Sequence, residues 1–311
     1  MITLKVIFWC ALFILFYTYI GYGLLVMLLV KVKESLCKPK SKIMPNIEEL
    51  PEVTLFIASY NEESVIRKKI DNCRALDYPS DKLTLLFVTD GTTDGSIAIL
   101  REVEADGKLP AIKVEHRPER MGKAAAFNRG ISFVKSPLVI FTDANTMLNP
   151  ESIMNIVLEF TDPKVGCVAG EKRVQGGESE AGAVAEEGLY WRYESFLKSL
   201  DYRLYTAVGA AGELFAVRTI LFEQLSDDTL LDDFMLSMNI ASKGYKIAYC
   251  SNAYAVEGTS ADMHEEAKRK RRISAGGLQS VWRLRRLLNF FRYGILSFQY
   301  LSHRVLRWTL A

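Results

Sequence analysis

The stretch from Leu138 to Leu148, LVIFTDANTML, joins a short apolar run to a pair of polar side chains. Its first four residues are apolar and follow Pro137, which is the pattern of a strand buried on both faces. Asp143 and Asn145 come where this strand would end. Because an open α/β sheet leaves a crevice beyond the carboxyl ends of its strands, an acid and an amide there suit a divalent cation held against a nucleotide diphosphate. A plain Asp/Asn turn is the alternative.

Strand and helix units of the same kind precede this stretch. Apolar runs separated by polar turns predict strands at 53–58, 83–88 and 111–115, and helices at 62–73 and 96–104. This alternation is typical of parallel βαβ units, so we expect an α/β fold. No GxGxxG follows any strand, which argues against a dinucleotide-dependent dehydrogenase.

Acidic side chains recur at the ends of the predicted strands. Glu62, Asp90 and Asp143 each follow an apolar strand, so all three would line one edge of one sheet. A further pair, Asp232 and Asp233, opens a predicted helix, where the helix dipole stabilises one carboxylate and the neighbouring charge raises the proton affinity of the other. A simple helix cap is the structural alternative for this pair.

The second half of the chain alternates less regularly. Its patterns predict helices at 150–160, 178–200 and 232–242, and strands at 165–170, 214–217 and 246–250. The aromatic residues of the long helix 178–200 are expected in the core, because each ring buries a large apolar area.

Composition and charge narrow the classes of protein. The chain has 311 residues, of which 49% are hydrophobic and 24% charged, enough for one large domain with additions. The net charge of +2 is small, but basic residues gather at 268–272 and in the tail that follows, which would face anions. The five cysteines show neither CxxC nor metal-ligand spacing, as suits a reducing compartment. The isolated His264 and His303 are expected to be structural.

An uncharged segment of about 25 residues, Val6 to Val30, lies near the N-terminus. At 1.5 Å per residue it can cross a hydrocarbon core of ~30 Å, so we interpret residues 1–31 as a transmembrane helix. A signal peptide would have a shorter apolar core and small residues at a cleavage site, whereas Lys31 and Lys33 follow here. These lysines favour a cytoplasmic position for the following domain, at the cell (inner) membrane.

Composition marks further regions after this helix. Pro39, Pro45 and Pro51 indicate a linker at 32–52. The regions expected after it are an α/β domain at 53–260, a basic helix with an interfacial amphipathic helix (Arg283 to Phe291) at 261–292, and a membrane-proximal segment at 293–311. We expect the last segment to stop before further transmembrane helices.

Eight sequence blocks follow one another between about Val53 and Gln279. They are ASYNEE, VTDGTTDGS, RMGKAAAFNRG, FTDANT, YWRYE, GAAGELFAVR, LLDDFMLSMNIASKGYKIAY and RKRRISAGGLQ. In this order they resemble family 2 glycosyltransferases, the branch with cellulose, hyaluronan and chitin-oligosaccharide synthases and bacterial exopolysaccharide transferases. The resemblance implies the Rossmann-like GT-A fold, with nucleotide-sugar-binding and acceptor-binding halves over one sheet. It also implies inverting transfer of a sugar from a nucleotide sugar.

The resemblance further implies roles for single residues on the donor side. Tyr60, Glu62 and Asp90 resemble nucleoside contacts, with Asp90 similar to the carboxylate that reads the uracil edge of a UDP-sugar. Lys123 resembles the lysine that meets the diphosphate, which a flexible ammonium can do as a point charge. A solvated lysine at a helix start is the alternative for Lys123.

Two acidic motifs of the family have counterparts here. Asp143 matches the first acid of the DXD motif and Asn145 replaces the second, so the resemblance implies a Mg²⁺ or Mn²⁺ site with one neutral amide ligand. Asp233 matches the second acid of the TED motif, which is the catalytic base, and Asp232 stands in place of its Glu.

The C-terminal block departs further from the family. Relatives that elongate a polymer carry QxxRW, whereas the aligned residues here are Arg269, Arg272 and Ile273. Arg272 and Arg269 are candidates to meet the diphosphate or the acceptor. The stacking Trp is absent, and the loss of an aromatic platform for a sugar argues against a processive synthase. A juxtamembrane anchor to anionic membrane lipid is a second role for the basic run.

These observations predict a membrane-anchored inverting glycosyltransferase that moves single sugars from a nucleotide sugar to a lipid-linked or polysaccharide acceptor. The alternative is a non-catalytic subunit that binds nucleotide sugar in a polysaccharide synthesis or export complex, motivated by Asn145 and the altered C-terminal block. We expect no nucleic-acid partner, because the basic charge lies beside a membrane segment.

Overall fold

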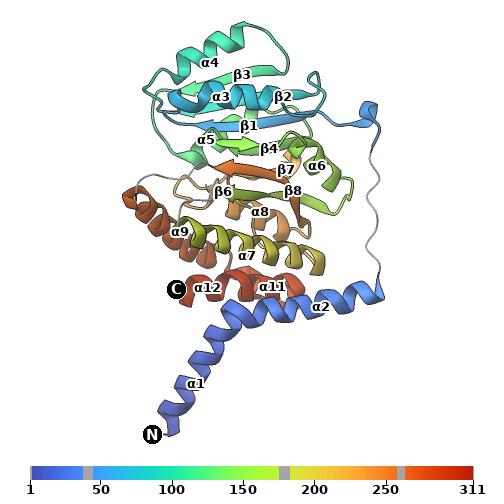
Figure 1. Cartoon of the computed structure of the whole chain (residues 1–311), viewed down its shortest axis with the longest axis vertical. Coiled ribbons are helices and arrows are strands. Elements are labelled where there is room, and N and C mark those ends of the chain that lie inside the picture. Colours follow the sequence, from blue (N-terminus) through green and yellow to red (C-terminus); the bar gives the residue numbers. More distant parts are fainter. Residues whose placement is uncertain (1, 38–44, 175–182, 258–262, 311) are drawn as a thin grey trace.

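Eight strands form one mixed sheet in the computed structural model, which describes residues 2–37, 45–174, 183–257 and 263–310 (Figure 1). The strands are β1 (Val53–Ser59), β2 (Leu83–Asp90), β3 (Ala111–Arg117), β4 (Leu138–Asp143), β5 (Thr146–Leu148), β6 (Val165–Val174), β7 (Leu214–Arg218) and β8 (Lys246–Glu257). Their order in the sheet is β3-β2-β1-β4-β7-β6-β8-β5. The first four strands are parallel, whereas β7 runs antiparallel to both of its neighbours, β4 and β6.

The direction of strand addition reverses at β1. From β1 the chain adds β2 and then β3 on one side, whereas β4 pairs with β1 on the other side. Such a switch point leaves a crevice beyond the carboxyl ends of the two central strands. Because β1 ends at Ser59 and β4 at Asp143, the segments that carry Tyr60 and Asn145 flank this crevice.

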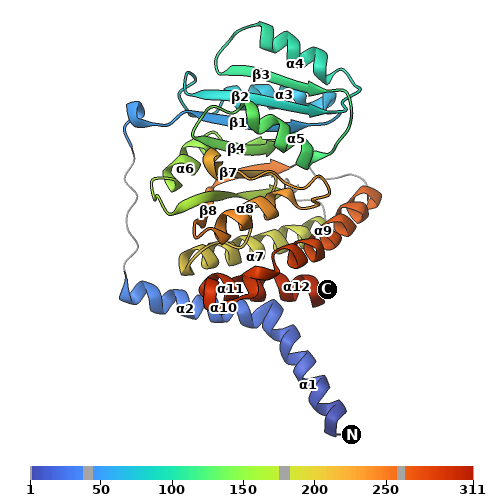
Figure 2. The ribbon, with the colours of Figure 1, turned by 180° about the vertical axis from the view of Figure 1, so that it is seen from behind.

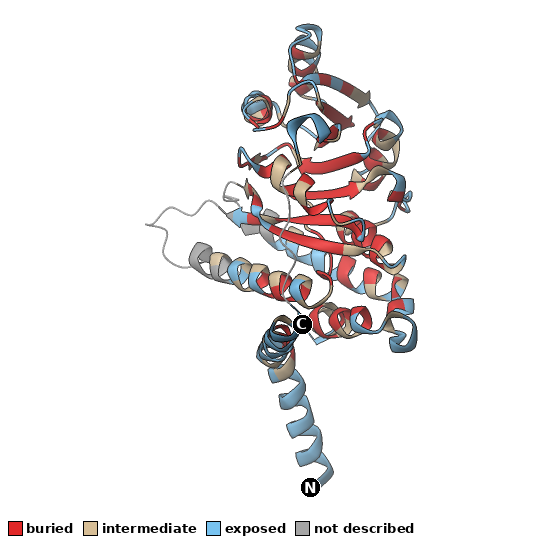
Figure 3. Ribbon diagram, turned by 90° about the vertical axis from the view of Figure 1, so that its right-hand side faces the viewer, coloured by how far each residue is buried: buried red, intermediate tan, exposed pale blue. Residues whose placement is uncertain are grey.

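Helices cover both faces of the sheet. They are α1 (Ile2–Phe16), α2 (Tyr22–Leu36), α3 (Glu63–Arg74), α4 (Ser96–Ala105), α5 (Lys123–Gly130), α6 (Ser152–Glu159), α7 (Ala183–Leu204), α8 (Asp232–Ser242), α9 (Met263–Arg283), α10 (Phe290–Tyr293), α11 (Ile295–Tyr300) and α12 (Leu306–Leu310). α3, α4 and α6 contribute to one apolar cluster, whereas α5, α8 and α11 contribute to the other. The buried residues concentrate in the sheet between these layers (Figure 3).

The central strands are buried on both faces, as expected for parallel strands covered by helices. On one face the ring of Phe141 lies 5.0 Å from that of Phe56 and 4.8 Å from that of Phe215. On the other face Leu55 and Ile140 join the cluster that contains α3 and α6. The unbroken apolar run of β4 therefore reflects burial on two sides.

Several predicted elements differ from those observed. The helix expected at 178–200 is found at Ala183–Leu204, and residues 175–182 lie outside the described part of the chain. The last predicted strand extends to Glu257, because its second half pairs with both β6 and the short strand β5. The predicted helix at 232–242 has the expected bounds.

The N-terminal helix changes direction in its middle. A π-helical turn at Tyr17–Gly21 joins α1 to α2. The described residues of α1 include none that is buried, whereas Tyr22, Val26 and Val30 of α2 are buried against α7. α1 therefore projects away from the domain and α2 lies along its base (Figures 1 and 2). The apolar segment Val6 to Val30 is thus divided, and only its first part is free of the domain.

The predicted amphipathic helix from Arg283 to Phe291 is not one helix, so this expectation is wrong. α9 ends at Arg283, a 3₁₀ turn covers Arg285–Leu288, and α10 follows. Leu284 and Leu287 are buried in the core, which explains the apolar spacing. The side chain of Asn289 accepts hydrogen bonds from two backbone N–H groups of α10 and so starts a new helix as its N-cap.

His303 has a structural position. Its ring is fully buried, with Nδ1 2.5 Å from a carboxylate oxygen of Asp201 and Nε2 3.3 Å from Glu194. Both acids belong to α7, so the ring fastens α7 to the C-terminal helices. The side chain of His264 lies outside the described residues.

Candidate active site

A lysine and an acid form an ion pair at the crevice beyond β1 and β4. Oδ1 of Asp143, the last residue of β4, accepts a 2.7 Å hydrogen bond from Nζ of Lys123, the first residue of α5. Burial acts against the ammonium, but Asp143, followed by Asp232 and Asp233, raises the pKa of Lys123. Lys123 is therefore a cation held at the open edge of the sheet rather than a solvated lysine at a helix start.

Asp90 orders the loop that leads to this lysine. Its Oδ2 accepts hydrogen bonds of 2.7 Å from the backbone N–H groups of Met121 and Gly122, and its Oδ1 accepts one of 3.2 Å from Arg129. Gly122 has φ +95°, which favours glycine and lets the loop turn into α5. Both carboxylate oxygens of Asp90 have hydrogen-bond partners within the chain. Contact between Asp90 and a nucleobase stays a prediction.

Tyr60 and Glu62 follow β1, which lies between the strands that end at Asp90 and Asp143. The guanidinium of Arg120 stacks 3.6 Å from the ring centroid of Tyr60, which forms a flat cationic surface. Burial, and then the charges of Asp143 and Asp94, raise the pKa of Glu62, so Glu62 and Asp143 are electrostatic neighbours. Arg120 was not among the predicted site residues, although it stands within the RMGK loop.

The acidic pair at the start of α8 is partly withdrawn from solvent, with Asp232 buried and Asp233 half-buried. Burial, and then the charge of Asp232, raise the pKa of Asp233 to about 7, while Lys123 opposes this rise. Asp232 is 8% exposed, and its Oδ2 is buried without a hydrogen-bond partner among the described residues. Leu231, and not either acid, stands at the N-cap position of α8, so the pair is not a simple N-cap.

Gly212 lies between the acidic pair and the lysine. A β-carbon added at Gly212 would lie 3.3 Å from Nζ of Lys123 and 3.5 Å from Oδ2 of Asp233. Glycine thus leaves open the space between these two side chains. Asp143, Lys123 and Asp233, which the sequence analysis selected separately, therefore form one cluster around this glycine.

Glu213 belongs to an ion-pair cluster beside this site. Its Oε1 lies 2.6 Å from Nζ of Lys172, which also contacts Glu257, and Glu257 lies 3.5 Å from Arg269. Burial acts to raise the pKa of Glu213, but Lys172 outweighs it and lowers this pKa. Glu213 is therefore a weaker candidate for a base than Asp233. Lys172 was not predicted as a site residue, because its partners Glu213 and Glu257 are far from it in the sequence.

The structure does not bring Arg272 into this cluster. Arg272 is exposed on α9, and no hydrogen bond or ion pair joins it to Lys123 or Asp233 within the described part of the chain. Arg269, one turn earlier, lies 3.5 Å from Glu257, which in turn contacts Lys172.

The donor set at Asp143 and Asn145 fits a divalent cation that is shared with a ligand. Asn145 is exposed beyond β4, and the described residues contain no group of three or more His, Cys, Asp or Glu side chains that could enclose a metal. Carboxylate and amide oxygens are ligands of Mg²⁺ and Mn²⁺, which commonly take their other ligands from phosphate groups and water. The chain alone therefore offers an incomplete oxygen site that a diphosphate can complete.

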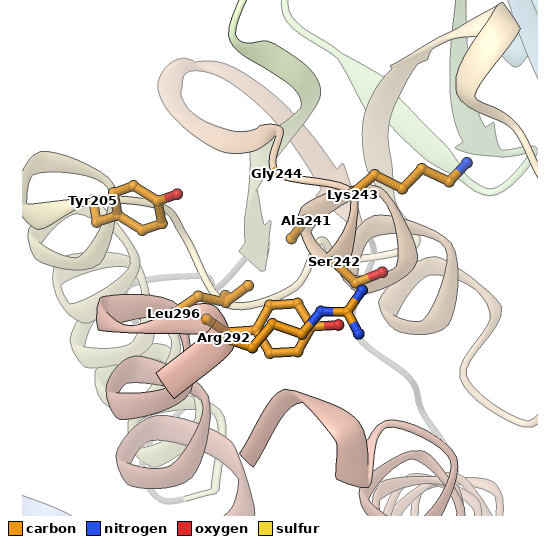
Figure 4. A pocket seen from close by; sticks show the side chains of 8 residues that line it. Tyr205, Ala241, Ser242, Lys243, Gly244, Arg292 and Leu296 are labelled. Carbon is orange, nitrogen blue, oxygen red and sulfur yellow. The ribbon is translucent and has the colours of Figure 1, made fainter. Parts of the chain in front are cut away.

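A cavity of about 250 Å³ lies elsewhere, at the C-terminal end of α8 (Figure 4). Side chains of Tyr205, Arg292 and Leu296 surround the turn at Lys243 and Gly244. Because α8 is 11 residues long, this cavity is about 16 Å from the end that carries Asp233. It is not the site of the acidic cluster.

The Glycosyl transferase family 2 model matches residues 54–225, which is more than half of the chain and includes Asp90, Lys123 and Asp143. The chain belongs to glycosyl transferase family 2. This family 2 glycosyltransferase is 26% identical over 212 residues to poly-beta-1,6-N-acetyl-D-glucosamine synthase of Staphylococcus aureus (strain COL), covering 66% of this chain and 49% of the relative. It is 25% identical over 211 residues to the probable glycosyltransferase YdaM of Bacillus subtilis (strain 168), covering 66% and 50%. The chain thus spans about half the length of these curated relatives.

Solved structures support the same fold for this glycosyltransferase. The mannosyltransferase PcManGT from Pyrobaculum calidifontis, in complex with GDP-Man and Mn²⁺, matches with a TM-score of 0.74 and 25% identity over 96% of this chain and 82% of that chain. S. aureus TarS 1-349, in complex with UDP-GlcNAc, matches with a TM-score of 0.51 and 15% identity over 76% and 67%. The predicted GT-A α/β fold is confirmed.

Proposed function

We propose that this glycosyltransferase is a membrane-anchored inverting enzyme that moves a single sugar from a UDP-sugar to a lipid-linked or saccharide acceptor. The observation that carries the proposal is the convergence of Asp143, Lys123 and Asp233 around Gly212, at the crevice beyond β1 and β4. A cationic edge that suits phosphate thus lies beside a half-buried carboxylate that suits proton transfer.

The donor diphosphate would bind at the edge formed by Asp143, Asn145 and Lys123. A bound Mg²⁺ or Mn²⁺ would neutralise charge on the leaving diphosphate, as divalent cations do in phosphate chemistry. Lys123 is already fixed by its 2.7 Å contact with Asp143, so its ammonium adds a preorganised charge at the same place. The PcManGT structure with GDP-Man and Mn²⁺ supports a nucleotide sugar and a divalent cation as ligands.

The nucleoside would lie against the surface formed by Tyr60 and Arg120. Their stacked arrangement offers a flat face to a base, and Glu62 follows Tyr60 on the same segment after β1. The loop that Asp90 orders would then direct the diphosphate toward Lys123.

Asp233 would act as the general base. It takes the proton of the acceptor hydroxyl while that oxygen bonds to the anomeric carbon and the bond between this carbon and the diphosphate oxygen breaks. Attack opposite the leaving group inverts the anomeric configuration. A pKa raised to about 7 suits this role, because a base is most effective when its pKa lies near the working pH.

Membrane association is supported by two features. The helical segment Ile2–Leu36, which bends at the π-helical turn Tyr17–Gly21, is long and apolar enough to cross a membrane by length and composition. Phe291 is fully exposed and Trp282 is 70% exposed, and the guanidinium of Arg285 lies 4.8 Å from the ring of Trp282. Aromatic rings beside arginine suit the lipid headgroup region. Lys31 and Lys33 support a cytoplasmic orientation of the domain.

The proposal is tested with the purified full chain and extracted membrane lipid, with UDP-GlcNAc, UDP-glucose or GDP-mannose as donor and with Mn²⁺ or EDTA. We expect metal-dependent release of UDP and transfer of the sugar to a lipid or saccharide acceptor, with Asp233→Asn as the inactive control. If GDP-mannose is turned over and neither UDP-sugar is, the proposal of an enzyme holds and the proposed nucleotide changes from UDP to GDP.

A non-catalytic subunit is the second candidate, favoured by the neutral Asn145 at a position where a charged ligand would bind a cation more strongly. Such a subunit would bind UDP and be stabilised by it, yet release no UDP from any donor in the same experiment. That combination of results would replace the enzyme proposal.

A further inference from the structure

A lysine lies fully buried beneath the turn that carries Asp143 and Asn145. Lys69 of α3 is 0% exposed, and its Nζ donates a 2.6 Å hydrogen bond to the carbonyl oxygen of Thr146 and a 3.2 Å bond to Oγ1 of Thr142. These two threonines stand on either side of the turn. The ammonium therefore contacts both ends of the segment that would hold the cation.

Such a position is costly for a lysine. Its neighbours along α3 include the buried apolar side chains of Ile66, Ile70 and Cys73, and burial lowers the pKa of Lys69, with Cys73 and Asp143 opposing this. A buried ammonium persists only where polar partners compensate for the lost water. The turn supplies these partners, so the contact is specific to this place.

The same hydrogen bonds extend to the acceptor side of the site. Oγ1 of Thr142 also donates a 2.9 Å bond to the carbonyl oxygen of Glu213, the residue after Gly212. Oγ1 of Thr146 donates a 3.0 Å bond to the carbonyl oxygen of Asp143. Lys69 thus lies at the centre of a network that joins the two segments on either side of the acidic cluster.

We propose that Lys69 is a positioning residue whose buried ammonium holds the turn from Thr142 to Thr146, and with it Asp143 and Asn145, in the conformation that binds the cation. The inference rests on the proposed function, because that proposal places a metal at Asp143 and Asn145. The lysine does not touch the cation, and two mechanisms oppose each other: loss of the ammonium loosens the turn, but it also removes a positive charge near the cation.

The test compares the full-length parent with Lys69→Met and with the matched control Lys68→Met, which makes the same change at the neighbouring exposed position of α3. The first readout is hydrogen exchange of the backbone amides at 142–146 in ligand-free protein. The second is the Kd of Mn²⁺, measured by thermal stabilisation in the presence of UDP. For Lys69→Met we expect faster exchange confined to the turn and a Kd for Mn²⁺ about tenfold higher, while Lys68→Met matches the parent.

If Lys69→Met does not fold, Thr142→Val replaces it, because valine keeps the shape and removes the hydroxyl that links Lys69 to Glu213. We expect the same direction of change with a smaller size. Unchanged exchange at 142–146 would overturn the inference, as would a lower Kd for Mn²⁺, which would mean that the ammonium acts only by charge repulsion. A parent that binds no UDP with Mn²⁺ would overturn the proposed function, and the exchange measurement would still decide the role of Lys69.

Discussion

At the residue scale, the chemistry of Asp233 comes from its surroundings. An Asp in water is ionised far below neutral pH, whereas burial and the neighbouring Asp232 raise the pKa of Asp233 to about 7. Lys123 limits this rise, so the carboxylate is about half ionised at neutral pH and is ionised above it. The negative charge of Asp232 and the positive charge of Lys123 thus act in opposite directions on the pKa of Asp233, and the result suits a general base for a hydroxyl group.

We expect Asp233→Asn to reduce the transfer rate about 100-fold or more while leaving UDP affinity nearly unchanged, because the amide keeps the shape and cannot accept the proton. Asp232→Asn should reduce the rate less. In the parent, the rate should fall as pH decreases below about 7, since protonation then removes the base. Initial-rate measurements between pH 5 and 9 check both expectations, and a near-parent rate for Asp233→Asn would direct attention to Asp232 or Glu213.

The charge at Asp143 governs the proposed metal site. Asp143→Ala should abolish metal-dependent UDP binding and transfer, because the remaining side-chain ligand would be the neutral amide of Asn145. Asn145→Asp should bind Mn²⁺ more tightly, because it adds a negative ligand. Calorimetric titration of UDP with Mn²⁺ and with EDTA measures both effects. Equal UDP affinity of the parent under the two conditions would contradict the metal site.

At the scale of elements, close backbone contacts position the two helices that carry Lys123 and Asp233. A β-carbon added at Gly130 of α5 would lie 2.3 Å from the ring of Phe56 on β1. Near the start of α8, a β-carbon at Gly209, which has φ +88°, would lie 2.2 Å from the ring of Phe234. Glycine therefore allows these segments to approach the sheet and α8 closely enough to bring the cluster together.

We expect Gly130→Ala to lower the free energy of unfolding by about 1–3 kcal/mol, because the methyl group must displace α5 from β1. The matched control is Gly188→Ala in α7, where an added β-carbon meets no atom of the described residues within 4 Å. That change should raise stability by about 0.5–1 kcal/mol, since alanine is the better helix former. Urea unfolding measures the free energy of unfolding of both variants. A change of the same sign in both, relative to the parent, would contradict the contact between Gly130 and Phe56.

At the scale of the whole molecule, the switch point of the sheet brings the proposed donor and acceptor segments to one crevice, and α2 lies along the base of the domain, next to α7 and α11 (Figure 1). α2 is part of the folded body, because Tyr22, Val26 and Val30 pack against α7. α1 contributes exposed apolar surface and no buried residue among those described. The two halves of one apolar segment thus have different roles.

Deletion of residues 2–16 should leave the Tm of the domain within about 2 °C of the parent, because these residues bury nothing against it. It should also move the protein from the membrane fraction toward the soluble fraction. The control Val26→Asp introduces an unpaired charge at a buried site and should lower Tm by about 5 °C or more. A Tm lowered by clearly more than about 2 °C on deletion of α1 would mean that α1 contacts the domain.

The sequence by itself determines the strands and helices of the donor half, the acids at their ends and the helix that begins at Asp232. These follow from local patterns, since periodicity, turns and motif spacing act over a few residues. Only the tertiary structure decides that Lys69 is buried, that Glu213 pairs with Lys172, and that the segment Val6 to Val30 is divided by its packing on α7. The reason is physical: desolvation and ion pairing depend on distances in space between residues far apart in the chain. A side chain's charge and partners therefore come from the folded molecule.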